Sequence, residues 1–200
     1  MKYESWFSTP VGVDFIKEID TERLKQYCLD LKNKDSGRTI SNAGGWQSEN
    51  LSFDIPEIQE LLQALWIRLI QMKDDLGIKD SVNLTIQNIW ININDRGNFN
   101  RPHAHPQSVI SGVYYVDADP VISGDIVFAS PIITHGYHWD KKWFKDGVSE
   151  TISSASCYYK PETNKVILFP GWVWHYVEPS NSDKQRISIA FNTGVEPDNG

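Results

Sequence analysis

Short alternating runs of apolar and polar residues fill the second half of the sequence and constrain the fold more than any other feature. From Ser81 onward, apolar residues occupy alternate positions, first at 82–86 and then at 89–93. Alternation of this kind places one face of a β-strand against a core. Further strands are expected at 108–116, 124–128, 153–159, 165–169 and 186–193. Short strands separated by turn residues at fairly regular spacing are typical of a β-sandwich or barrel.

The first part of the chain shows helical periodicity instead. Apolar residues recur at helical spacing over 14–34, with a break near Asp20, and again in a second segment that ends at Gly77. Asp54 is the expected N-cap of this second helix, because Glu57 follows three residues later as in a capping box. Helices this amphipathic need a surface to cover, so we expect them to pack on the β-rich half.

Length and composition fit one folded domain. The 200 residues are 40% hydrophobic and 12% aromatic, which suits a chain with a full core. We therefore expect a single domain over 1–200, with a helical N-terminal buttress at 1–80 and a β core at 81–195. The formal net charge of −7 comes without any run of Lys or Arg. This balance gives no support for a nucleic-acid partner or a membrane surface.

The cysteines and the N-terminus favour a cytoplasmic location. Cys28 and Cys157 lie far apart, without the spacing of a metal or redox motif. Isolated thiols of this kind are usual in a reducing compartment. The polar start of the chain does not look like a signal peptide, and no apolar run approaches the length of a membrane span.

Three histidines in the β-rich half have the spacing of a metal site. His103 and His105 are two residues apart between prolines, and His175 follows an apolar strand and a turn. Residues two apart on a strand point the same way, so the first two can aim at one point. A close pair of ligands with one distant histidine leaves positions on the metal open for small molecules. The pattern predicts a mononuclear iron site.

Arg186 and Ser188 are expected to lie beside this metal. They alternate with Ile187, Ile189 and Phe191, so if the apolar residues pack on the core, the polar ones face the barrel interior or water. A guanidinium inside a barrel needs an anion, and a carboxylate matches its planar fork. The pattern thus predicts an acidic co-substrate next to the iron.

These segments together resemble the 2-oxoglutarate/Fe(II)-dependent dioxygenase superfamily, and most of all its small prolyl-hydroxylase-like branch in bacteria and phages. The similarity runs from Asn88 to Asn192, with a further match at the Gly-Gly-Trp-Gln-Ser segment 44–48. The matching motifs are 103–106, 111–115, 124–128, the Phe-Pro turn 169–170 and 186–188.

The resemblance implies a double-stranded β-helix, or cupin-like jelly roll, with Fe(II) near the barrel mouth. His103 and His175 would take the two metal-binding histidine positions. Arg186 would hold the distal carboxylate of 2-oxoglutarate with help from Ser188. Related enzymes often place polar residues against the co-substrate nine to eleven positions before the first histidine.

Asn92 and Asn94 occupy that place in this sequence. They share a strand face, and the competing interpretation is that they serve the turn that follows them. Tyr114 and Tyr115 are alternatives for the same role. Because adjacent strand residues point to opposite faces, one of these two tyrosines must face the barrel interior.

His105 departs from the pattern of the superfamily, which has Asp or Glu at this position. A carboxylate cancels one charge of Fe(II), whereas a neutral imidazole leaves both. Three-histidine iron sites occur in cupin-type dioxygenases that use no 2-oxoglutarate. The nearby Asp117 and Asp125 are acidic, but their spacing from His103 does not fit the pattern.

The sequence therefore leads to three hypotheses. The first is an oxygenase that uses Fe(II), 2-oxoglutarate and O2 to hydroxylate a small molecule or a protein side chain, with succinate and CO2 as co-products. The second is a three-histidine iron dioxygenase without 2-oxoglutarate, and the third is a non-catalytic jelly-roll binding protein. The aromatic-rich segment 131–149 is the expected substrate cover, with His135 and His138 interpreted as solvated or cover-lining residues rather than metal ligands.

Overall fold

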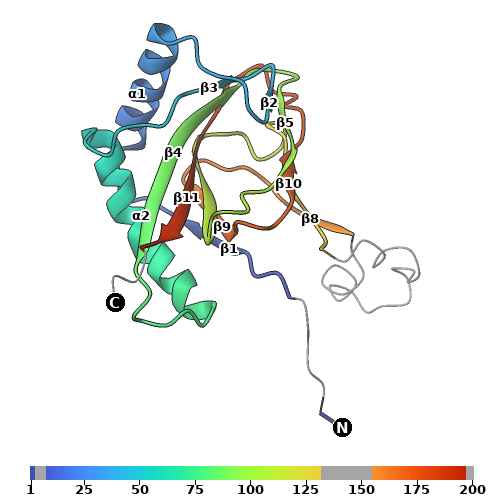
Figure 1. Cartoon of the computed structure of the whole chain (residues 1–200). Coiled ribbons are helices and arrows are strands. Elements are labelled where there is room, and N and C mark those ends of the chain that lie inside the picture. The colour runs from blue at the N-terminus through green and yellow to red at the C-terminus, as the bar shows by residue number, and fades with distance from the viewer. Residues whose placement is uncertain (3–7, 132–154, 197–200) are drawn as a thin grey trace.

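Two antiparallel sheets face each other in the fold (Figure 1), which is seen in a computed structural model that describes residues 1–2, 8–131 and 155–196. Within these residues, the larger sheet has the strand order β1-β9-β6-β11-β4-β3 and the smaller sheet β2-β5-β10-β7-β8. The strands of the larger sheet are β1 (Gly12–Phe15), β9 (Lys165–Pro170), β6 (Ile110–Asp117), β11 (Arg186–Val195), β4 (Leu84–Asn94) and β3 (Trp46–Gln47). Those of the smaller sheet are β2 (Asn42–Ala43), β5 (Phe99–His103), β10 (His175–Val177), β7 (Ile126–Ala129) and β8 (Ser156–Tyr159). This arrangement confirms the expected jelly roll.

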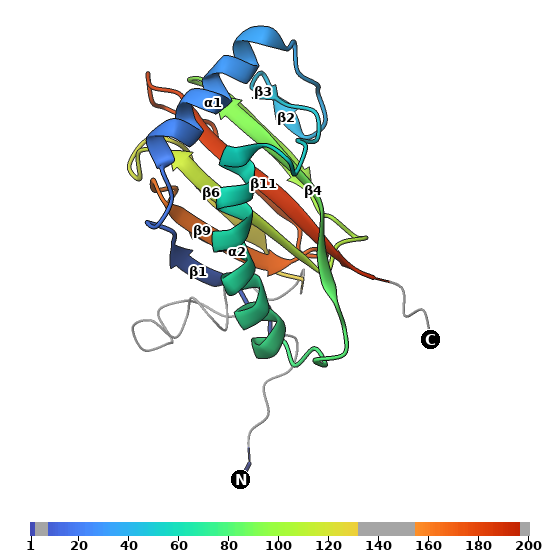
Figure 2. The same ribbon diagram turned by 90° about the vertical axis from the view of Figure 1, so that its left-hand side faces the viewer.

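Two helices cover the outer face of the larger sheet, as Figure 2 shows. They are α1 (Thr21–Lys34) and α2 (Pro56–Asp75). Leu61, Leu65 and Leu69 of α2 are fully buried in a core that also contains Ile91 of β4 and Ile189 of β11. Burying apolar side chains of this size stabilises the fold by roughly 1.5–3 kcal/mol each. The helices thus hold the larger sheet from behind, which leaves its other face free to form the barrel interior.

The alternation along β4 changes phase at a β-bulge. Leu84 pairs with Val195 and Ile86 with Thr193, but Asn88 pairs with Asn192, so Gln87 is the extra residue. A bulge shifts the alternation by one position. The helix-facing residues are therefore even-numbered before Gln87 and odd-numbered after it. This is the physical reason why the sequence pattern runs first through 82–86 and then through 89–93.

Both helices begin later than the sequence predicted. Residues 14–15 belong to β1, and the backbone N–H of Ile16 donates to Asn164 O at 2.8 Å, so this segment pairs with the sheet instead of coiling. Asp20 then caps α1, because its side chain accepts a hydrogen bond from the Arg23 N–H. Asp54 is not the N-cap of α2, which makes that prediction wrong.

The N-cap of α2 is Ile55, without a side-chain hydrogen bond. Pro56 occupies the first turn of this helix. Its ring needs no backbone donor and fixes a helical φ, so it starts the helix without a capping side chain.

Several short strands were not predicted. β2 and β3 lie within the segment 35–50, which is rich in Gly, Ser and Asn and for which no strand was predicted. β5 and β10 occur where prolines, glycine and aromatics interrupt any alternation. These strands are two to five residues long, too short to show a period. The expected substrate cover at 131–149 lies almost wholly outside the described residues. Among those residues, neither helix is long and apolar enough to cross a membrane.

Candidate active site

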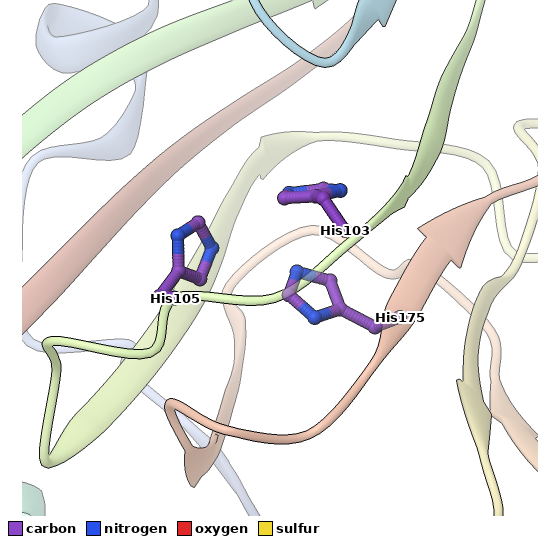
Figure 3. Close-up of side chains that lie close together, drawn as sticks. All are labelled: His103, His105 and His175. Carbon is purple, nitrogen blue, oxygen red and sulfur yellow. The ribbon is translucent and has the colours of Figure 1, made fainter.

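The histidine cluster is formed by His103, His105 and His175, whose rings lie close together (Figure 3). His103 is the last residue of β5 and His175 the first of β10, and the two are direct partners across the antiparallel ladder. His105 follows two residues after β5 ends. One ring nitrogen from each histidine lies within 4.8 Å of the other two. Three convergent imidazoles at this separation are suited to share one metal ion.

Backbone carbonyls orient two of the three rings. The Nδ1 of His103 lies 2.7 Å from the carbonyl oxygen of Arg101, and the Nδ1 of His175 lies 2.9 Å from that of Val173. Since a carbonyl only accepts, each Nδ1 carries the proton and donates it. The Nε2 of each ring is then the free lone pair for a metal. This outer hydrogen bond is a usual feature of histidine ligands.

His105 is positioned by its backbone and by a ring contact. Its N–H donates to Gly171 O at 2.7 Å, and its carbonyl accepts from the Ser108 N–H at 2.9 Å. A Cβ on Gly171 would lie 2.4 Å from Ser108 O and 2.7 Å from His105 O, so the close approach requires glycine. The ring packs edge-on against Trp90 of β4, with centroids 5.9 Å apart. The turn before β10 therefore fixes His105 next to His175.

The cluster is held in its neutral form. Burial and, to a smaller extent, the neighbouring His103 together lower the pKa of His175 to about 3. Burial also lowers the pKa of His105 to about 4, and it lowers the pKa of His103. Neutral imidazole is the form that binds a metal, so at neutral pH no proton has to leave before binding.

The opposite side of the interior is an anion wall, formed by Asn92, Tyr115, Arg186 and Ser188. Ser188 of β11 pairs directly with Asn92 of β4 on one side and with Tyr115 of β6 on the other. Arg186 lies two residues before Ser188 and shares its face. The guanidinium carbon of Arg186 lies 5.2 Å from the ring centroid of Tyr115. Ile187, Ile189 and Phe191 pack on the helix side, as the alternation predicted.

The wall is buried, and one polar atom on each of three of its residues makes no hydrogen bond. Arg186 is 3% exposed, and no acidic side chain of the described residues pairs with it. Its Nε, the Oδ1 of Asn92 and the hydroxyl of Tyr115 make no hydrogen bond. A buried polar group without a partner costs about 1–3 kcal/mol, and more when it is charged. Two of these atoms, the Nε of Arg186 and the hydroxyl of Tyr115, are donors, and unmet donors beside a buried positive charge suit an anion.

Asn94 lies further along the same strand face and pairs directly with Arg186 across the ladder of β4 and β11. Its Oδ1, like that of Asn92, is buried without a hydrogen-bond partner. Asn94 is 1% exposed, and its Nδ2 donates to Asn100 Oδ1 at 3.4 Å. Neither Asn94 nor Tyr115 lines one of the two cavities at the site, so a role in binding the co-substrate stays a prediction for both residues.

Two cavities meet at the histidine cluster. The inner one, about 50 Å³, connects all three histidines with Asn92, Arg186 and Ser188. The outer one, about 480 Å³, opens over His103 and His105 and is bounded by Trp90. His103, His105, Trp90 and Ser41 border both cavities, which places the histidine cluster at their junction. A ligand bound at the histidine cluster would thus border both the inner and the outer cavity.

The structure brings the five principal residues of the sequence prediction to one place. Of the two tyrosines, Tyr115 faces the interior, whereas Tyr114 packs in the helix-side core and hydrogen-bonds Asn164. Asp117 pairs with Lys25 at 2.6 Å, away from the cluster. Sequence reasoning missed Trp90, although its place between two core isoleucines on β4 assigns it to the interior. His135 and His138 lie outside the described residues.

Comparison with known proteins gives the family. The model of the family described as "Putative 2OG-Fe(II) oxygenase" matches residues 88–192, just over half of the chain. No curated protein matches.

Many solved structures share the fold. A Pseudomonas putida prolyl-4-hydroxylase has a TM-score of 0.62 at 13% identity, over 95% of each chain. HygX from Streptomyces hygroscopicus, solved with nickel and 2-oxoglutarate bound, has a TM-score of 0.63 at 10% identity, over 93% of this chain and 83% of HygX. A Trichoplax adhaerens prolyl hydroxylase, solved with a peptide fragment of hypoxia inducible factor, has a TM-score of 0.62 at 11% identity, over 92% and 83%. These identities show the fold alone, but together with the family match over the site strands they lead to one conclusion: the chain belongs to the 2OG-Fe(II) oxygenase family.

Proposed function

We propose that this oxygenase hydroxylates a C–H bond of its substrate and releases succinate and CO2, with Fe(II) held by His103, His105 and His175. The iron and 2-oxoglutarate supply the oxidising chemistry when bound, and the protein orients them and excludes water. The observation that carries the proposal is the junction of a neutral three-imidazole cluster and a buried, unpaired arginine in one inner cavity.

The residues of the histidine cluster fit a divalent iron. Imidazole suits Fe(II), and three ligands on one side leave positions for a chelating co-substrate and oxygen. The carbonyls of Arg101 and Val173 fix two of the rings before any metal arrives. Because His105 brings no negative charge, the site keeps both charges of the iron. That charge favours a dianionic co-substrate over a neutral one.

The anion wall fits the distal carboxylate of 2-oxoglutarate. The fork of Arg186 can donate two hydrogen bonds to a carboxylate, and Ser188 and Tyr115 can each donate one more. Binding would give the buried guanidinium the counter-charge that it lacks among the described residues. Only the distal half of the molecule has to enter the narrow inner cavity, because its chelating end would remain at the histidine cluster, where the wider outer cavity begins.

An anaerobic titration tests both parts of the proposal. Fe(II)-loaded protein is titrated with 2-oxoglutarate while the visible metal-to-ligand charge-transfer band is recorded. We expect the band in the wild type. In Arg186→Gln we expect the midpoint to rise by about 30-fold or more, since loss of one partner of a buried charge pair costs about 2–5 kcal/mol. Arg96→Gln is the matched control, because Arg96 is exposed and pairs with Asp183 away from the site.

The three-histidine dioxygenase without 2-oxoglutarate stays the second candidate, since His105 stands where the family has a carboxylate. Its signature is different: iron binds with the stoichiometry of one site, but 2-oxoglutarate produces no band and no succinate. Membership of an oxygenase family weighs against the non-catalytic binding protein. That third hypothesis requires a protein that purifies and folds without affinity for iron.

A further inference from the structure

The outer cavity has the size of a small-molecule site. Its volume of about 480 Å³ falls within the range of roughly 300–1,000 Å³ that is usual for ligand pockets. It opens directly over His103 and His105, so a molecule held there would lie next to the bound metal. None of the catalytic assignments made above uses its remaining polar lining.

The charges around this cavity are all positive. Arg38 and Arg101 line it, and no acidic side chain does so among the described residues. Arg38 is neutralised by Glu49, with Nη1 and Oε2 3.1 Å apart. Arg101 pairs with no carboxylate among those residues, and its Nη1 donates only to the carbonyl of Asn42 at 3.3 Å. An uncompensated cation at the mouth of a pocket, in a chain of net charge −7, favours an anionic ligand.

Gln47 is a buried polar group aimed into the same cavity. It is 3% exposed, and its Oε1 has no hydrogen-bond partner. The preceding Trp46 packs on the helix-side core, so Gln47 on the short strand β3 must face the interior. The Nε of Arg38, which lines the cavity with it, is also buried without a partner. Leaving such groups unmet is costly, so they indicate a ligand that meets them.

A chain of hydrogen bonds occupies the side-chain oxygen of Asn88 and leaves its amide N–H groups free to donate. Ser111 donates to Asn192 Oδ1 at 2.7 Å, and Asn192 Nδ2 donates to Asn88 Oδ1 at 2.9 Å. The oxygen of Asn88 is therefore occupied, and its amide hydrogens remain for a ligand in the cavity that it lines. Together with the guanidinium of Arg101, the cavity presents donors, one unmet acceptor in the Oε1 of Gln47, and one aromatic wall, Trp90.

We propose that the outer cavity binds the primary substrate of this oxygenase, and that this substrate is a small molecule with a carboxylate, anchored by Arg101. This inference rests on the proposed function, since it places the oxidised carbon beside the metal of the histidine cluster. Gln47 and Asn88 orient the polar part of the molecule, and its apolar part packs on Trp90. Arg101 connects the outer cavity with the histidine cluster, because its backbone carbonyl accepts a hydrogen bond from the ring of His103.

Calorimetric titration with matched probes tests the inference. Benzoate, hexanoate and 3-phenylpropionate, each paired with its primary amide, are titrated anaerobically into protein loaded with Fe(II) and 2-oxoglutarate. We expect at least one acid to bind about 10-fold more tightly than its amide, because a hydrogen bond to a charged group contributes about 1.5–3 kcal/mol. Arg101→Gln should lose that preference. The substitution keeps the backbone carbonyl that orients His103, and Arg96→Gln is the control that should keep the preference.

The outcomes separate this inference from the proposed function. If wild-type protein forms the charge-transfer band but acids and amides bind alike, or no acid binds, the substrate class is wrong while the oxygenase assignment holds. The substrate class is equally wrong if Arg101→Gln binds the acids as tightly as the wild type, or if only an acidic peptide binds. Absence of the band with wild-type protein refutes the use of 2-oxoglutarate instead. In that case, an acid preference in the Fe(II)-loaded protein that depends on Arg101 still upholds the anion site.

Discussion

The histidine cluster and the anion wall face each other across one cavity, but they are built in different ways. The anion wall lies on the central strands of the larger sheet, where β11 is ten residues long and paired on both sides. The histidine cluster lies on the ends of short strands and on a turn, with β10 only three residues long. One region is fixed by long ladders, the other by a few local contacts.

This difference shows that the molecule fixes the positions of its functional side chains in two ways. Arg186 is the first residue of β11 and pairs with Asn94 of β4. The ladder with partners on both sides begins at the next residue, Ile187, and it holds the strand that keeps the guanidinium buried. The histidine cluster has no such ladder, so its geometry depends on single contacts: two carbonyls at Nδ1 and the approach of Gly171 to His105. Substitutions should therefore affect the wall through binding energy and the cluster through geometry.

The largest effect is expected from His175→Ala. It removes one of the three convergent nitrogens, and the loss of Fe(II) affinity should exceed the roughly 10–100-fold that loss of an outer hydrogen-bond partner costs. Metal content after dialysis and an Fe(II) titration measure it. Retention of iron at wild-type affinity would contradict the three-histidine site.

His105→Ala in the same assay sharpens the comparison within the cluster. A loss equal to that of His175→Ala identifies His105 as a full ligand. A much smaller loss leaves a two-histidine site, with His105 acting only as a neighbour.

Arg186→Met should weaken 2-oxoglutarate binding and stabilise the protein at the same time. The substitution removes the guanidinium that would bind the carboxylate of 2-oxoglutarate. It also removes a buried charge that has no counter-ion among the described residues. Replacing buried charged groups by apolar ones often stabilises a protein by about 1–4 kcal/mol. In a chain of this length we expect Tm to rise by about 2–4 °C for each kcal/mol. Thermal unfolding without co-substrate measures this, and an unchanged or lower Tm would show that the protein itself satisfies Arg186.

The sequence predicted the anion wall better than the histidine cluster, and the ladders are the reason. Alternation along 186–193 was enough to place Arg186 and Ser188 on the face opposite the core isoleucines, because successive side chains of a strand point to opposite faces. It left open whether that face is the barrel interior or water. Asn92 was proposed from the family resemblance, with a role in the following turn left open, and the same alternation would have placed both Asn92 and Trp90 on the interior face. The bulge at Gln87 is visible in the sequence only as a change of phase.

The cluster was found from residue type and spacing, but its geometry was not predictable. His105 lies outside any strand, so strand alternation was the wrong reason for its convergence with His103. What brings it in is the bond of its N–H to Gly171, which is 66 positions away in the sequence (171 − 105). Such contacts between two turns leave no periodic trace. The polar lining of the outer cavity also leaves no periodic trace. Gln47 and Arg101 lie on strands too short to show an alternation.

Gly171→Ala should disturb the cluster without touching a ligand. The added Cβ would meet the carbonyls of Ser108 and His105, so the turn and His105 must shift. We expect Fe(II) affinity to fall by about 10-fold, the lower end of effects seen for outer partners of metal ligands. Gly12→Ala is the matched control, since its Cβ would meet only Leu168 atoms at 3.7 Å or beyond. Equal affinities in the two variants would show that the cluster is as rigid as the wall.

Ser188→Ala should have the smallest effect and should act on the wall alone. Ser188 pairs with Asn92 and Tyr115 through the backbone ladders of β4, β11 and β6, so removal of its hydroxyl leaves those ladders intact. Losing one hydrogen bond of about 0.5–1.5 kcal/mol should raise the 2-oxoglutarate midpoint by about 2–10-fold, with Fe(II) affinity unchanged. The charge-transfer titration measures the first and metal binding the second. If iron binding changed as well, the wall and the cluster would be energetically coupled through the inner cavity, and the distinction between ladder-held and contact-held chemistry would fail at this position.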